Sequence, residues 1–297
     1  MEWQQLSYFK TVAELQHMTR AAEQLSISQP ALSRSMSRLE EELGVPLFER
    51  KGRTILLNRY GELFLKRVYR MLEEFVEGKQ EIRDLIDPES GEVSLGFLHT
   101  LGTEKIPELI GAFRAAYPRL SFQFTQNNSY ALIQQMEAGA FDLCLTTPIA
   151  SSMKINWQRL WREELFVIVP LGHPLANRKH ITLDEIAGED FIAIKEGNSL
   201  RQMTDYFCQE AGMRPKILFE GEEIHTLAGL VGAGLGVSLI PDVKGLDFHK
   251  ITRLQVTRPM CERSLGMAWI EGRYLSPAAE RFKDFVVNYF AEGTTLD

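Results

Sequence analysis

Cysteine is scarce in this sequence, with three residues among 297: Cys144, Cys208 and Cys261. They are far apart and lack the close spacing of a zinc site or a disulfide scaffold. We therefore expect three free thiols.

Long hydrophobic runs are also missing. The most apolar stretches, residues 165–172 and 227–241, are too short or too rich in glycine to span a membrane. The first residues, MEWQQLSYFKTVAE, lack the basic segment and apolar run of a secretory signal. We therefore expect a cytoplasmic protein with no membrane partner.

Composition and charge indicate a globular protein with one basic end. The length suits two or three domains, and 44% hydrophobic and 25% charged residues are ordinary for folded proteins. Residues 1–72 hold 11 Lys+Arg against 8 Asp+Glu, although the whole chain has a formal net charge of −7. A polyanion would dock at this end.

The first 44 residues predict three helices. Apolar residues recur at helical intervals over residues 6–15, and a short second helix follows with Thr19 as its expected N-cap. Ser28 caps a third helix, Pro30 lies in its first turn, and Gly44 ends it.

The third helix has two unlike halves. Its first half exposes polar and basic residues: Gln29, Pro30, Ser33, Arg34, Ser37 and Arg38. Its second half exposes residues 40–42, three glutamates that phosphate would repel. Gln pairs with adenine and Arg with guanine, so the first half suits a DNA major groove. The alternative is an ordinary solvated face.

A hairpin and a long helix come next. Two apolar runs flank residues 50–53, Arg-Lys-Gly-Arg, which predicts a hairpin whose Arg53 reaches a minor groove or a phosphate. Asn58 caps a helix to about Ile86, with apolar residues at the heptad spacing of a two-helix seam. We expect this seam to mediate self-association through Phe64, Val68, Met71, Phe75, Ile82 and Leu85. The alternative is packing within its own domain.

After a break near residues 87–91 the pattern changes to alternating strands and helices. One such series covers about 93–146 and a second about 162–255, and a strand and a helix end the chain. This pattern predicts parallel sheets covered by helices, in two α/β lobes.

Over nearly its whole length the chain resembles the LysR-type transcriptional regulators. The resemblance is carried by AAEQLSISQPALSRSMSRLEEELGVPLFER, followed by Arg53 and Gly61. It implies a winged helix-turn-helix domain (1–58), a linker helix for dimerisation (59–88) and an effector-binding domain (89–297). That domain is similar to periplasmic binding proteins, with lobe I at about 92–160 and 265–297 and lobe II at about 161–264.

The resemblance also implies partners and contacts. Double-stranded DNA would meet Gln29, Pro30, Ser33, Arg34, Arg38 and Arg53. The chain would form a homodimer or homotetramer at the bacterial nucleoid, with RNA polymerase as a further partner. Between the lobes a small effector would be bound. The matching positions there are His99, Thr100, Ser129, Thr146, Gly197, Asn198, Ser199 and Arg201.

Each effector position has an ordinary alternative: a helix cap for the hydroxyl and amide residues, a hinge or surface residue for His99. Arg201, one turn into its helix, is expected to pair with a carboxylate. The polar, largely uncharged set favours a small carboxylate or an amino-acid-like effector. No metal or cofactor is expected, because no second histidine or carboxylate lies at metal-ligand spacing from His99.

Two features argue against other activities. Peroxide-sensing members of the family have a reactive cysteine where this chain has Ser199, so Cys208 lacks the partner for a redox switch. The glycines of VGAGLGV follow a helix and precede a strand, the reverse of a dinucleotide-binding order, and predict a tight connection.

Three functions fit a chain with two α/β lobes. The first is a DNA-binding regulator controlled by an effector. The second, a solute-binding protein, would need a secretory signal and no residues 1–90. The third is an enzyme on the two-lobe scaffold, but the sequence offers no nucleophile–base pair and no paired carboxylates. The regulator is therefore expected.

Overall fold

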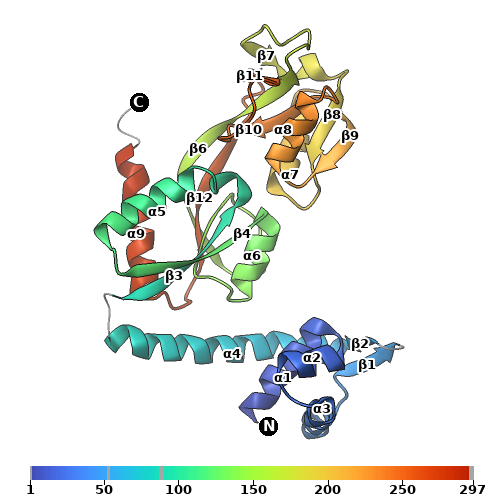
Figure 1. Ribbon diagram of the computed structural model, residues 1–297, viewed down its shortest axis with the longest axis vertical. Helices are drawn as coiled ribbons and strands as arrows, with labels where there is room; N and C mark the ends of the chain where they lie inside the picture. The colour runs from blue at the N-terminus through green and yellow to red at the C-terminus, as the bar shows by residue number, and fades with distance from the viewer. Residues whose placement is uncertain (1, 52–53, 87–89, 294–297) are drawn as a thin grey trace. The chain divides into compact units, whose positions relative to one another are not determined.

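A computed structural model describes residues 2–51, 54–86 and 90–293 (Figure 1). The chain divides into two compact units, residues 1–85 and residues 86–297. We call them the N-terminal unit and the effector unit. No helix of the described residues is long and apolar enough to cross a membrane.

The N-terminal unit is a helical bundle with a hairpin. Its elements are α1 (Trp3–Leu15), α2 (Met18–Gln24), α3 (Gln29–Leu43), β1 (Phe48–Lys51), β2 (Thr54–Leu57) and α4 (Arg59–Ile86). Phe9, Leu32 and Leu39 are fully buried at the centre of its core. The strands pair antiparallel, so the hairpin prediction is confirmed, whereas Arg53 lies outside the described residues.

The caps explain where these helices begin and end. Ser28 Oγ accepts the N–H of Ala31, and Gly44 ends α3 in the left-handed conformation, as predicted. The prediction for α2 was wrong: its N-cap is His17, whose Nδ1 accepts the N–H of Arg20. His17 directly precedes the helix, and its imidazole nitrogen takes the place of the expected Thr19 hydroxyl as the capping acceptor.

The apolar stripe of α4 has two roles, and the seam prediction was wrong for its first half. Val68 is fully buried in the core of the N-terminal unit, and Phe64 and Met71 pack against that core. Farther along, Phe75 and Ile82 are 50% and 62% exposed. Phe75 contacts the ring of Trp3 at 4.5 Å between centroids. The side chain of Leu85 lies outside the described part.

Lobe I of the effector unit, residues 90–164 and 262–293, is a sheet with helices on both faces. Its strand order is β4-β3-β5-β12-β6, and β3 runs parallel to β4 and β5. Helices α5 and α9 pack together through Phe113 and Phe282, and α6 covers the other face (Figure 1). The elements are β3 (Gly91–Leu98), η1 (His99–Leu101), α5 (Lys105–Ala116), β4 (Leu120–Asn127), α6 (Ser129–Glu137), β5 (Leu143–Thr146), β6 (Ile155–Pro170), β12 (Glu262–Ile270) and α9 (Pro277–Gly293).

Lobe II, residues 165–261, has its own hydrophobic core, which contains Phe191, Leu239 and Leu254. The second half of β6 pairs with β10 and β11, and β8 pairs in parallel with β9. The elements are β7 (His180–Thr182), η2 (Leu183–Ile186), β8 (Asp190–Ile194), α7 (Ser199–Glu210), β9 (Lys216–Gly221), α8 (Ile224–Gly232), β10 (Ser238–Pro241) and β11 (Ile251–Arg258). The two-lobed α/β prediction is confirmed.

Strand β6 joins the lobes. Its first half pairs with β12 in lobe I and its second half with β10 and β11 in lobe II. One continuous strand therefore crosses between the two sheets, and the link from β11 to β12 is the return crossing.

Two smaller predictions are confirmed in the effector unit. The glycine-rich run connects the end of α8 to β10, and a Cβ on Gly236 would lie 2.3 Å from the carbonyl oxygen of Asp190. The three cysteines are free and buried. Burial raises the pKa of Cys208 to about 11, so its thiol stays protonated at neutral pH.

Candidate DNA-binding face and effector cavity

The predicted DNA-reading residues lie on one face of α3. Gln29, Pro30, Arg34 and Arg38 are exposed, and Ser33 is half-buried. Arg34 and Arg38 line a groove of about 530 Å³ between α1 and α3. The opposite face of α3 is fixed in the core, so these side chains point outward from a rigid helix.

The glutamates at the far end of α3 have an additional role. Glu40 is half-buried, and its Oε1 accepts the N–H groups of Leu47 (2.7 Å) and Phe48 (3.2 Å). The expectation that Glu40 is simply exposed was wrong: it ties the helix to the start of the hairpin.

A cavity of about 30 Å³ lies between the lobes of the effector unit. Lobe I lines it with residues 98–100 and 127–129 and with Arg263. Lobe II lines it with Ile194, Asn198, Leu200 and residues 222–224. His99, Thr100, Ser129 and Asn198 of the predicted set are thus brought together.

Hydroxyl groups from the two lobes meet beside this cavity. Ser129 Oγ lies 2.6 Å from Ser199 Oγ, and Thr147 Oγ1 donates to Ser199 Oγ at 2.8 Å. All three residues are buried. Ser129 and Ser199 occupy the first turns of α6 and α7, where unpaired N–H groups favour an anion.

The hydroxyl cluster includes a residue that the sequence reasoning missed. The prediction named Thr146, but Thr147 makes the bond to Ser199. Thr146 is fully buried, and its Oγ1 has no hydrogen-bond partner among the described residues. Adjacent residues at a strand end face opposite ways, so a shift of one position exchanges the two side chains.

Arg263 is the second residue that the sequence reasoning missed. It is only 4% exposed, its Nε donates to Glu163, and its Nη2 donates to Thr100 Oγ1 at 2.8 Å. Its Nη1 has no hydrogen-bond partner in the part of the chain that the structure describes. A buried guanidinium thus lines the cavity with its Nη1 group available as a donor. The only local signal was a charge at the start of an apolar strand.

His99 faces the other lobe. Its Nδ1 lies 3.8 Å from a carboxylate oxygen of Glu223, across the cavity. That separation is too long for a hydrogen bond. Gly197 lies in the turn before α7 with φ 84°, and Asn198 caps that helix by accepting the N–H of Leu200. Gly197 therefore shapes the turn rather than the cavity wall.

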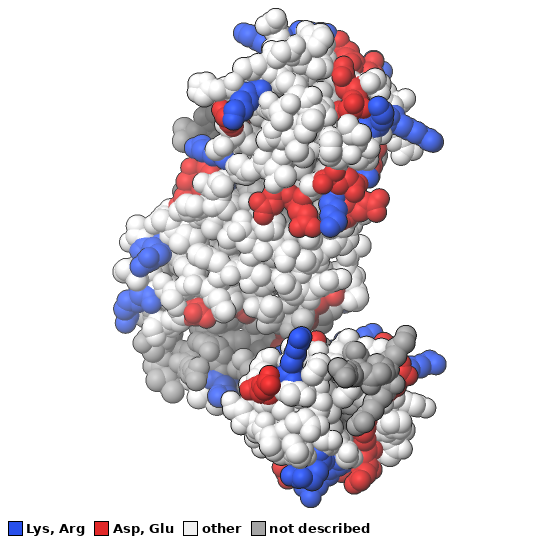
Figure 2. Space-filling model, turned by 45° about the vertical axis from the view of Figure 1, so that its right-hand side comes forward, with Lys and Arg blue, Asp and Glu red and all other residues white. Residues whose placement is uncertain are grey.

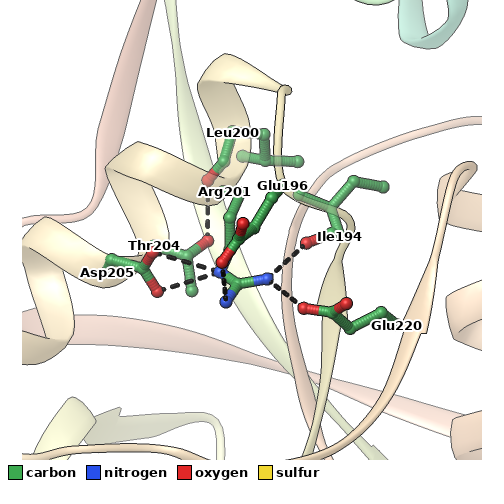
Figure 3. A network of polar contacts seen from close by, with 7 residues as sticks. All are labelled: Ile194, Glu196, Leu200, Arg201, Thr204, Asp205 and Glu220. Atoms are coloured by element: carbon green, nitrogen blue, oxygen red, sulfur yellow. Dashed lines mark hydrogen bonds and ion pairs between the residues drawn. The ribbon is translucent and has the colours of Figure 1, made fainter.

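Arg201 does not face the cavity, contrary to the expected carboxylate contact. Its guanidinium is almost buried and binds Asp205 (3.1 Å), Glu220 (2.5 Å) and the carbonyl of Ile194 (3.2 Å), as Figure 3 shows. Glu196 lies 3.8 Å away. Because three carboxylates already surround this cation, we leave it out of the effector site.

Comparison with known proteins identifies the family to which this chain is similar. Residues 3–62 match the model described as bacterial regulatory helix-turn-helix protein, lysR family. Residues 87–291 match the model of the LysR substrate binding domain. These two matches cover nearly the whole chain.

Relatives and a solved structure agree. The chain is 56% identical to the uncharacterized HTH-type transcriptional regulator YybE of Bacillus subtilis (strain 168), covering 98% of this chain and 100% of YybE. It is 35% identical to the transcriptional dual regulator GltC of the same strain, covering 98% of each chain. The effector-binding domain of QuiR in complex with shikimate is similar at 30% identity and TM-score 0.66, covering 68% of this chain and 98% of that one.

These matches identify the regulator among the three functions. Helix α3 and the two-lobed domain fall inside the matched ranges. The relatives are named as transcriptional regulators rather than as enzymes or solute carriers. The chain therefore belongs to the LysR family of bacterial transcriptional regulators, and it is a DNA-binding regulator with an effector-binding domain.

Proposed function

We propose that this regulator binds a small carboxylate in the cavity between the lobes and that the carboxylate sets its affinity for operator DNA. The observation that carries the proposal is the hydroxyl cluster of Ser129, Ser199 and Thr147, which joins the lobes beside the buried Arg263. A carboxylate placed there would accept hydroxyl hydrogens, the N–H groups of two helix N-termini and the available Nη1. The shikimate bound by the similar QuiR domain is itself a carboxylate.

The size of the cavity indicates how the effector would act. A volume of about 30 Å³ holds only about one or two water molecules, so a metabolite enters when the lobes separate. The effector would replace the direct bond between Ser129 and Ser199 with bonds to itself. It would then favour the lobe arrangement that it binds more tightly, which is how a ligand shifts an equilibrium.

The test is titration calorimetry of the full chain with a panel of small carboxylates. We expect Ser199→Ala to weaken the binding of a panel member by about tenfold or more, because one charged hydrogen bond is lost. Ser121→Ala is the matched control, since its hydroxyl only donates to the carbonyl of Gly91 on β3. Equal affinities in both variants, or binding of no carboxylate, would refute the proposal.

Three further partners belong to the same proposal. The exposed residues of α3 would read operator DNA, and the exposed part of α4 would pair with a second copy of the chain to form a dimer or tetramer. At promoters on the nucleoid the bound regulator would meet RNA polymerase. A footprint upstream of the chain's own gene, at two salt concentrations, tests the DNA contact, because phosphate contacts weaken as salt rises.

A further inference from the structure

Charge along the cavity wall points to a second group on the effector. Arg263 is paired with Glu163, and Lys195 is paired with Glu222 at 3.0 Å. The carboxylate of Glu223 forms no ion pair with a Lys or Arg among the described residues. Its one titratable partner there is His99, whose Nδ1 lies 3.8 Å away. The wall therefore has one carboxylate in excess.

The backbone around Glu223 leaves its side chain available. Glu223 is the N-cap residue of α8, with an extended backbone and no capping hydrogen bond from its side chain. Acidic N-cap residues usually accept N–H groups of the first turn. Here the carboxylate instead lines the cavity opposite the groups of lobe I.

The surroundings increase the negative potential. Figure 2 shows a group of acidic side chains, with a basic side chain among them, on one face of the effector unit, and other Lys and Arg side chains elsewhere on that face. Glu222, also in the cavity wall, and Glu196, three residues before Ser199, have side chains that are 76% and 83% exposed. A plain carboxylate would bring a second negative charge to this wall, and like charges repel. A cationic group on the same molecule would remove that cost.

We infer that the effector is a zwitterion of the amino-acid class, whose ammonium group is bound by Glu223 while its carboxylate meets the Ser129–Ser199 hydroxyls and Arg263. This inference rests on the proposed carboxylate site and narrows its ligand class. An ammonium has three donors and no acceptor, so it fits the carboxylate of Glu223, and a hydroxyl or keto group does not gain the same ion pair.

The experiment compares matched pairs of ligands on the full chain. Titration calorimetry with the twenty L-amino acids and their 2-hydroxy acid counterparts keeps each carbon skeleton and changes only the amino group. We expect at least one amino acid to bind about tenfold or more tightly than its hydroxy acid, as expected for one charged hydrogen bond. Glu223→Gln should remove most of that preference.

Glu196→Gln is the matched control, because Glu196 is a nearby exposed acid outside the cavity wall. It should leave the preference unchanged. If hydroxy acids bind and amino acids do not, or if Glu223→Gln preserves the preference, the inference fails while the carboxylate site stands. If neither series binds, both fail.

Discussion

Gly61 lies at a close approach between α4 and the segment before the hairpin. It is in the first turn of α4, and a Cβ at this position would lie 2.2 Å from the carbonyl oxygen of Leu47 and 2.7 Å from Leu57. Leu47 is itself buried in the core, so its carbonyl has little room to move. Close approach, rather than an unusual backbone angle, explains this glycine.

We expect Gly61→Ala to lower the free energy of unfolding of the N-terminal unit by about 1–3 kcal/mol, the usual cost of overpacking. Gly78→Ala in the same helix is the control. A Cβ on Gly78 meets no described atom within 4 Å, and alanine favours helix by up to about 1 kcal/mol. Urea unfolding of both variants checks this, and equal midpoints would contradict it.

Arg34 is the residue whose loss should change DNA specificity most clearly. It is exposed on α3 and lines the groove. If it forms a bidentate pair with a guanine, Arg34→Ala weakens operator binding by about 1–3 kcal/mol and leaves scrambled DNA little affected. Arg34→Lys keeps the charge and should lose the same discrimination. Gel shifts on both DNAs measure this, and an equal loss on both would assign Arg34 to phosphate contacts.

Residue-scale prediction succeeded where the signal was local. Ser28 and Asn58 were predicted as caps because a cap needs only its own helix, and both accept the expected N–H groups. Arg263 was missed because its burial depends on Glu163, a residue 100 positions away on a neighbouring strand. No local stretch of sequence contains both Arg263 and Glu163.

At the scale of elements, α6 is held at both ends. It begins with Ser129 in the hydroxyl cluster and ends with Glu137. One carboxylate oxygen of Glu137 accepts from the hydroxyl of Ser151 and from the N–H and hydroxyl of Ser152, both at 3.0 Å for Ser152. This contact fixes the helix to the loop before β6.

That contact predicts a pH dependence of stability. Partial burial raises the pKa of Glu137, but the hydrogen bonds from Ser151 and Ser152 outweigh it and hold the pKa below the usual glutamate value. A lowered carboxyl pKa gives stability that is present above the unfolded-state pKa and lost as pH falls through the folded-state pKa. We therefore expect the urea midpoint of unfolding to decrease as the pH is lowered below about 4.3, the usual glutamate pKa. Glu137→Gln should remove this part of the decrease. An unchanged acid limb in Glu137→Gln would contradict the assignment.

The exposed part of α4 gives a second element-scale prediction. Val76 and Ile82 are 65% and 62% exposed, whereas Phe64, Val68 and Met71 of the same helix pack on the core of the N-terminal unit. Ile82→Glu should shift sedimentation of the chain toward the monomer, because a charge would enter an apolar seam. Lys66→Glu, an exposed charge change on the same helix, is the control. Equal sedimentation of both variants would locate self-association elsewhere.

The same helix shows what periodicity leaves undecided. A heptad spacing predicts that one face is covered, and it does not distinguish a second chain from the helices of the same unit. Phe64, Val68 and Met71 have the seam spacing, yet they pack on the core of their own unit. The helix itself was predictable, whereas the partner of each turn required the tertiary fold.

At the scale of the whole effector unit, the lobes are joined by charges as well as hydroxyls. Lys244 of lobe II lies 2.5 Å from Glu104 of lobe I, which raises the pKa of the lysine. Glu104→Lys would place two like charges there. We expect it to change effector affinity about two- to fivefold, the scale of an exposed pair.

The swapped double variant, Glu104→Lys with Lys244→Glu, should restore the original affinity, because it rebuilds the pair in reverse. Titration calorimetry of the wild type, both single variants and the double variant completes the cycle. Additive effects in the double variant would show that the pair does not couple lobe closure to binding.

The crossing strands have a consequence for how this protein can be taken apart. Glu164 is paired with Glu262 at the point where the chain leaves lobe I and returns to it. Every buried residue of the lobe II core falls between Leu165 and Cys261. Lobe II is therefore an insertion between Glu164 and Glu262, two paired residues at the edge of lobe I. A short turn that joins Glu164 directly to Glu262 would remove lobe II and leave the sheet of lobe I paired. In topological terms, one small α/β domain carries the other as an elaborate loop.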